Sequence, residues 1–129
     1  MDDTQETIPK KRILLVEDER GVRETIRSLL LLDAHEVVEA NNGAEAINLF
    51  SQSDFDLVMT DYRMPFVDGS ELAAKIRQIA PSKPILMVTG HGYRPSPRNP
   101  VNAVLRKPFA LAELRSAVNG LLSPVENAG

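Results

Sequence analysis

Cysteine is absent from this chain of 129 residues, and so are long apolar runs and a large excess of charge of one sign. The lack of cysteine excludes a disulfide framework, a zinc–thiolate centre and a thiol nucleophile. No window approaches the ~20 apolar residues that a membrane helix needs, and the charged N-terminal residues enclose no apolar signal-peptide core. We therefore expect a cytoplasmic protein with no membrane partner.

The balance of charge limits the partners further. The chain has 15 basic and 18 acidic side chains, which gives a net charge of -3. Proteins that bind DNA or RNA through its phosphates usually carry a marked basic excess or a basic stripe. We therefore expect no nucleic-acid binding by this chain.

The length fits one domain between two short tails. A chain of this size buries roughly two thirds of the surface that its unfolded form exposes, so it needs no structural metal to fold. Residues 1–10 and 124–129 are polar, and each segment contains or follows a proline. We predict two flexible tails there and a single domain over residues 11–123.

Between the tails, short apolar runs rich in β-branched residues alternate with longer segments whose apolar residues recur every three or four positions. This alternation predicts an α/β fold with a parallel sheet. Strands are expected at 12–16, 35–39, 55–60, 85–89 and 102–106. Helices are expected at about 20–32, 43–52, from about 70, and 110–122.

The segment between the last two predicted strands is unusual. Residues 90–100 must return the chain to the start of a parallel strand, and they include Pro95, Pro97 and Pro100. Proline lacks a backbone donor and clashes with the preceding helical turn, so this segment has room for at most one turn of helix. The pattern is therefore (βα)5 with a short or irregular fourth helix.

Five polar residues follow or end predicted strands: Glu17, Asp18, Asp61, Thr89 and Lys107. Because the carboxyl ends of parallel strands lie along one edge of a sheet, we expect these side chains to converge. Adjacent carboxylates repel each other unless a cation offsets their charge, and Mg²⁺ prefers such oxygen ligands. Each residue alone has a simpler explanation: a helix cap, a turn aspartate, a strand threonine or a solvated lysine.

Together the five residues match the needs of phosphoryl transfer. The transition state of that reaction spreads charge over the phosphoryl oxygens, so catalysis depends on positioning and on neutralisation of charge. A metal held by acids, a carboxylate nucleophile, a hydroxyl donor and an ammonium group supply these functions. A carboxylate nucleophile would form an aspartyl phosphate.

Four segments of the chain together resemble the receiver domain of bacterial response regulators: ILLVED, DYRMPFVDG, MVTG and LRKPF, in this order. The similarity covers about residues 11–122. It implies a flavodoxin-like, doubly wound sheet of strand order 2-1-3-4-5. It also implies a signalling switch rather than an enzyme, phosphorylated with Mg²⁺ by a histidine kinase or a histidine phosphotransfer protein and acting through a conformational change.

The resemblance assigns roles at the acidic end of the site. Asp61 matches the aspartate that accepts the phosphoryl group. Asp18 matches the direct Mg²⁺ ligand, and Glu17 matches the acid that reaches the metal mainly through water. The backbone carbonyl of Arg63 matches the remaining protein ligand of the metal.

Further residues match positions that surround the phosphoryl group. Thr89 matches the hydroxyl that moves to bond a phosphoryl oxygen, and Lys107 matches the lysine that pairs first with the acids and then with the phosphoryl group. Pro108 matches a proline usually preceded by a cis peptide bond. Asp68 and Gly69 match the turn that shapes the loop below the site.

The chain also departs from the family pattern. Val104 stands where the family has a switch aromatic, so the usual coupling of threonine movement to ring rotation cannot operate in that form. Arg63 and His91 lie where residues of the family affect the phosphoryl lifetime, or they are solvated loop residues. His35 is expected to be an ordinary residue of an edge strand.

Two other functions remain open from the sequence. One is an Mg²⁺-dependent phosphatase or phosphotransferase acting on small molecules, although such enzymes generally have a substrate cap that is not evident here. The other is a structural pseudo-receiver that docks partners without phosphorylation. With no effector segment after residue 123, we expect the output to lie in another protein or in a longer parent chain.

Overall fold

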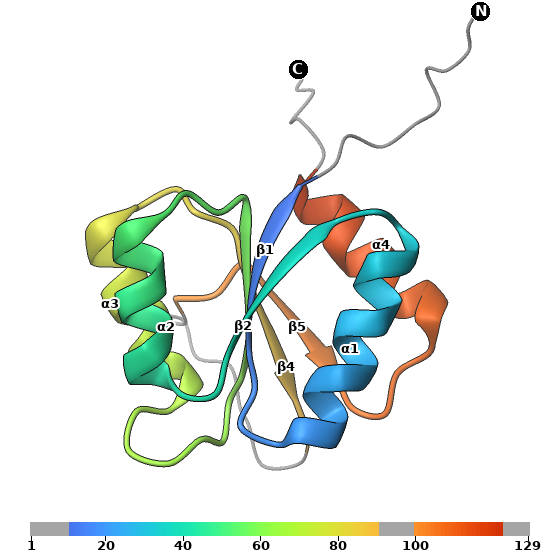
Figure 1. Cartoon of the computed structure of the whole chain (residues 1–129), viewed down its shortest axis with the longest axis horizontal. Helices are drawn as coiled ribbons and strands as arrows, with labels where there is room; N and C mark the ends of the chain where they lie inside the picture. The colour runs from blue at the N-terminus through green and yellow to red at the C-terminus, as the bar shows by residue number, and fades with distance from the viewer. Residues whose placement is uncertain (1–10, 91–99, 123–129) are drawn as a thin grey trace, which may run out of the picture.

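The computed structural model describes residues 11–90 and 100–122, which form a five-stranded parallel sheet with helices on both faces (Figure 1). The strands are β1 (Arg12–Val16), β2 (Glu36–Ala40), β3 (Leu57–Asp61), β4 (Ile85–Thr89) and β5 (Ala103–Arg106). The helices are α1 (Arg20–Leu32), α2 (Gly43–Gln52), α3 (Gly69–Ile79) and α4 (Leu111–Leu122). The strand order is β2-β1-β3-β4-β5, which confirms the predicted fold class and topology.

The central strands are the most apolar ones. All five residues of β3 and of β4 are buried, and so are four of the five residues of β1. Continuous apolar runs of this kind are expected where helices cover both faces of a parallel strand. The edge strand β2 is less apolar and only its last residue, Ala40, is fully buried.

The helices form two layers, with α2 and α3 on one side of the sheet and α1 and α4 on the other (Figure 1). Successive residues of β1 contribute to opposite layers: Leu14 and Val16 pack in the α2/α3 core, whereas Ile13 and Leu15 pack in the α1/α4 core. This alternation follows from the two-residue period of a strand. The sheet is thereby held between two apolar cores, and its carboxyl edge is fixed in place.

The element boundaries agree with the predicted ones to within about two residues. The one boundary shift that matters concerns His35, which lies before β2 rather than inside it and is 2% exposed. The reason is the end of α1, where Ala34 has a φ of 65° and the N–H of His35 donates to the carbonyl of Leu30. This left-handed helix stop uses His35 to close the helix, so the strand starts one residue later.

Several predictions concern residues outside the described part of the chain. These are the two tails, the short fourth helix within 91–99, and the role of His91. Among the described residues, those that flank the gap, Gly90 and 100–102, belong to no helix. None of the described helices is long and apolar enough to cross a bilayer.

Candidate functional site

The structure brings the five predicted polar residues to one edge of the sheet. Asp61 and Thr89 are the last residues of β3 and β4, Glu17 and Asp18 directly follow β1, and Lys107 directly follows β5. Since β1, β3, β4 and β5 are consecutive neighbours in a parallel sheet, all these strand ends lie along one edge. The predicted convergence is confirmed.

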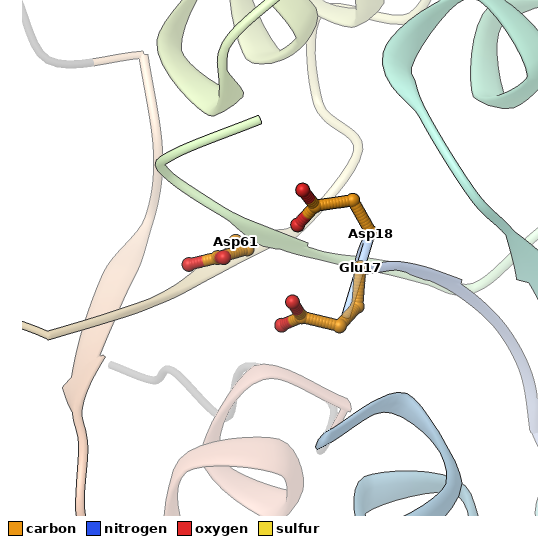
Figure 2. A group of neighbouring side chains, drawn as sticks. All are labelled: Glu17, Asp18 and Asp61. Atoms are coloured by element: carbon orange, nitrogen blue, oxygen red, sulfur yellow. The ribbon is translucent and has the colours of Figure 1, made fainter. Parts of the chain in front are cut away.

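Three carboxylates form the acidic part of the site. One oxygen from each of Glu17, Asp18 and Asp61 lies within 4.8 Å of the others, and Figure 2 shows the three side chains projecting from two adjacent strand ends into a shared space. Glu17 and Asp61 are buried, with 1% and 8% exposure, whereas Asp18 is exposed. The cluster is therefore open to solvent on the side of Asp18.

Asp18 does not cap α1, which removes the simpler explanation for its position. The N-cap residue of α1 is Glu19, and its side chain makes no capping hydrogen bond. Asp18 therefore belongs to the acid cluster, whereas Glu17 joins both regions, because its Oε2 accepts the backbone N–H of Glu19 at 3.2 Å.

Lys107 brings positive charge to the cluster. Its Nζ lies 3.4 Å from Oε1 of Glu17 and 3.5 Å from Oδ1 of Asp61. Its backbone N–H donates to the carbonyl of Thr89 at 2.8 Å, which joins the end of β5 to the end of β4. One ammonium group thus faces two buried carboxylates.

The charge balance of the site is incomplete without a further cation. Burial, together with the nearby Asp61 carboxylate, raises the pKa of Glu17 from 4.5 to about 7. The N–H of Glu19 and the ammonium of Lys107 oppose this rise but do not cancel it. Three convergent carboxylate oxygens with too little positive charge are the donor set that a hard divalent cation such as Mg²⁺ prefers.

Backbone packing fixes the position of Asp61. Its Oδ1 accepts a hydrogen bond from the N–H of Tyr62 at 2.8 Å, and the N–H of Gly69 donates to the carbonyl of Tyr62 at 2.8 Å. A Cβ atom added to Gly69 would lie 2.3 Å from the carbonyl oxygen of Asp61. The start of α3 therefore packs directly on the end of β3, and only glycine fits there.

The sequence analysis missed Arg23, a residue of α1 that contacts the backbone of Glu17 and the side chain of Glu39. Its Nη1 donates to the carbonyl of Glu17 at 2.8 Å, and its Nε lies 3.0 Å from Glu39 on β2. The arginine belongs to an amphipathic helix, where the spacing pattern assigns charged residues to the solvent face. Nothing in the pattern distinguishes this arginine from the exposed ones.

An open depression of about 350 Å³ lies beside the acids, lined by Asp61, Arg63, Thr89, Gly90 and Lys107. Thr89 is 1% exposed, whereas the Arg63 side chain is exposed at the rim. The Lys107–Pro108 peptide bond is cis, as the resemblance implies. The depression gives a small tetrahedral group access to the carboxylate of Asp61.

Comparison with known proteins identifies the family of this arrangement. A sequence model of the response regulator receiver domain matches residues 13–119. Response regulator MprA of Mycolicibacterium vanbaalenii is 36% identical over 92% of this chain and 54% of its own length. Response regulator protein FleR of Pseudomonas aeruginosa is 38% identical over 63% of this chain and 17% of its own length. The chain thus spans about half, or less, of the length of these relatives.

Solved structures of response regulators have the same fold as this chain. The response regulator TrrA from Thermotoga maritima, in complex with Mg²⁺ and BeF, superposes with a TM-score of 0.82 and 33% identity over 87% of this chain and 99% of that chain. The chemotaxis protein CheY4 of Vibrio cholerae superposes with a TM-score of 0.80 and 25% identity over 88% of this chain and 100% of that chain.

Proposed function

The chain belongs to the response regulator receiver family, and from this membership we propose that Asp61 accepts a phosphoryl group from a phosphohistidine of a partner protein in a Mg²⁺-dependent reaction. The donor would be a histidine kinase or a histidine phosphotransfer protein. The observation that carries the proposal is the position of Asp61. Its carboxylate belongs to a cluster of three acids, lies 3.5 Å from Nζ of Lys107 and lines an open depression.

In the proposed reaction an oxygen of Asp61 attacks the phosphorus atom in line with the bond to the donor imidazole. The O–P bond forms as the N–P bond breaks, and the imidazole leaves with the bonding electron pair. Lys107 would offset the charge on the phosphoryl oxygens, and the Thr89 hydroxyl would donate a hydrogen bond to one of them. Charge neutralisation would come from Mg²⁺, held by Glu17, Asp18, Asp61 and the carbonyl of Arg63.

The same residues explain how a signal would arise. Lys107 pairs with Glu17 and Asp61 in the structure described here. A phosphoryl group on Asp61 would compete for this ammonium and for the Thr89 hydroxyl, which shifts the balance between two conformations of the strand ends. Val104 supplies no ring at the switch position, so the output would not depend on the rotation of an aromatic side chain there.

The wider setting follows from the family. The curated relatives are signalling regulators, so we place this chain among signalling switches in the cytoplasm, with phosphotransfer proteins rather than nucleic acid as its direct partners. The switch unit would span residues 11–123, with residues 1–10 and 124–129 as tails. Arg63, which lines the depression, would influence the access of water to the phosphoryl group.

Incubation with acetyl phosphate and Mg²⁺, followed by intact-mass measurement, tests the proposal. We expect one phosphoryl group on the native chain and none on the Asp61→Asn variant or after chelation of Mg²⁺. Asp54→Asn is the matched control, because Asp54 is an exposed aspartate that precedes β3 at the opposite edge of the sheet. An unmodified native chain, or a phosphorylated Asp61→Asn variant, would contradict the proposed function.

A further inference from the structure

The loop between β3 and α3 exposes an aromatic ring at a high energetic cost. Phe66 is 98% exposed, and its φ of 69° lies in the left-handed region that residues with a Cβ rarely adopt. An apolar ring in water and a left-handed backbone at a non-glycine residue are each unfavourable. Strain of this kind persists where the surrounding structure enforces it, and it is often found at functional sites.

The local structure enforces this conformation. The N–H of Val67 donates to the carbonyl of Pro65 at 2.7 Å, so Phe66 is the middle residue of a tight three-residue turn with positive φ, which is a rare and strained type. Met64 before the turn is buried in the α2/α3 core, and Val67 after it packs against the same core. A Cβ on Gly43 would lie 2.8 Å from Val67, so the loop is tightly packed there. The ring is held outward by a loop that is anchored on both sides.

The loop also borders the phosphoacceptor. Arg63, three residues before Phe66, lines the depression at Asp61. Phe66 lies five positions after Asp61, and five steps of fully extended chain span at most about 18 Å. A protein interface of standard size covers about 800 Å² per partner, equivalent to a disc of roughly 16 Å radius. A protein docked over the depression would therefore cover or border the ring, whereas a small phosphodonor would not reach it.

We propose that Phe66 is an apolar anchor for the protein that delivers the phosphoryl group, and that it inserts into an apolar recess beside the phosphohistidine of that partner. This inference rests on the function proposed above. Aromatic side chains near the centre of an interface contribute a large share of binding energy. The other large hydrophobic residues that are exposed in the described part of the chain, Leu31, Leu32 and Ile79, lie at the carboxyl ends of α1 and α3, at the opposite edge of the sheet.

Two variants remove the ring without disturbing the turn. Asn and Gly both tolerate positive φ, so Phe66→Asn and Phe66→Gly should fold at least as well as the native chain. Leu32→Asn is the matched control, because it removes an apolar side chain that is 65% exposed and distant from the depression. Labelling by acetyl phosphate is measured first on all four proteins and should be equal. Failure of the native chain to label in that step would count against the proposed function itself.

Transfer from protein donors is measured next. The histidine kinases encoded in the same genome are purified as catalytic cores and autophosphorylated with radiolabelled ATP, and the one that labels the native chain fastest serves for the series. We expect kcat/KM for transfer to fall about tenfold or more in both Phe66 variants, mainly through KM, and to stay unchanged in Leu32→Asn.

Four results would overturn the inference. The first is that the Phe66 variants accept the phosphoryl group from the kinase at the native rate. The second is that these variants lose labelling by acetyl phosphate. The third is that no kinase labels the native chain although acetyl phosphate does. The fourth is a native dimer, seen by analytical ultracentrifugation, that Phe66→Asn dissociates, because the ring would then serve a second copy of this chain.

Discussion

At the scale of single residues, the buried Glu17 makes the stability of the metal-free protein depend on pH. Its pKa rises from 4.5 to about 7 on folding, so between these values the folded state binds more protons than the unfolded state. Stability therefore falls as the pH rises through this window, and the loss is complete above about pH 7. Glutamine cannot ionise, so Glu17→Gln should avoid this loss. As the pH rises from about 5 to about 8, we predict that the stability of Glu17→Gln increases by about 2 to 3 kcal/mol relative to that of the native chain. Urea unfolding in the presence of a chelator measures this difference.

Magnesium supplies the control for that prediction. If the cation occupies the acid cluster, it removes the penalty on the charged form of Glu17, so Mg²⁺ should raise the melting temperature of the native chain more at about pH 8 than at about pH 5. Glu17→Gln should lose most of this response. Equal pH dependence in the two proteins, with or without Mg²⁺, would show that Glu17 is not the group responsible.

The sequence predicted the site residues that lie at strand ends, but not those whose role depends on tertiary contacts. Asp61, Thr89 and Lys107 were predictable because strands end in a recognisable pattern and parallel strand ends meet at one edge. Arg23 was not predictable, because its contact with the site is to the backbone carbonyl of Glu17 and its spacing matches a solvent-exposed helix position. The exposure of Phe66 was equally hidden, since it arises from the turn around it and not from its own residue type.

At the scale of elements, the junction of β3 and α3 depends on one glycine. A Cβ on Gly69 would approach the carbonyl of Asp61 to 2.3 Å and Cε of Met87 to 3.0 Å. We predict that Gly69→Ala loses about 1 to 3 kcal/mol of stability through overpacking and slows phosphorylation, because the end of β3 must move. Gly21→Ala is the matched control, since a Cβ there meets nothing within 4 Å. Urea unfolding and acetyl phosphate labelling should separate the two variants, and similar behaviour of both would contradict the packing argument.

The end of α1 provides a prediction of opposite sign. Ala34 follows the end of α1 and has a φ of 65°. The helix end is closed by two hydrogen bonds, from the N–H of Ala34 to the carbonyl of Leu31 and from the N–H of His35 to the carbonyl of Leu30. Glycine adopts this conformation without the penalty of a Cβ, so Ala34→Gly should stabilise the protein by about 0.5 to 1 kcal/mol. The same change at the exposed helical residue Ala74 should cost about 1 kcal/mol. Thermal unfolding of the two variants measures both changes in stability. Destabilisation by Ala34→Gly would contradict the left-handed helix end at this position.

That helix stop also explains the misplaced start of β2. The sequence predicts helix ends from glycine or asparagine, and here an alanine takes the left-handed position. Without that marker, the alternating pattern around His35 suggested a strand. By contrast, Asn42 and Asp68 are residue types preferred at helix N-termini, and both accept capping hydrogen bonds at the starts of α2 and α3.

At the scale of the whole molecule, the class of fold and the order of the strands came from different sources. Alternating strand and helix patterns predict a parallel sheet, but they do not fix which strands are neighbours. The order followed from the resemblance carried by the segments around Glu17, Asp61, Thr89 and Lys107. The structure places the site where β1 and β3 are adjacent and β2 lies on the other side of β1, which is the switch point of a doubly wound sheet.

The last strand of this sheet is tied to the rest of the molecule by Arg77. Its guanidinium donates to the carbonyls of Pro81, Lys83 and Pro100 and to Oδ1 of Asn102, which also accepts the N–H of Ile85. One side chain thus joins the turn after α3 to the segment that enters β5.

Lysine keeps the charge of Arg77 but cannot reach four acceptors in different directions, because it lacks the planar fork of donors. We predict that Arg77→Lys loses about 1 to 3 kcal/mol of stability, since partly buried carbonyls lose their donors. It should also raise hydrogen exchange in β5 more than in β1. Arg20→Lys is the matched control, because the Arg20 side chain is 82% exposed and pairs only with Glu24 among the described contacts. If β5 exchanges at the native rate in Arg77→Lys, the anchoring of the strand must come from its pairing with β4 alone.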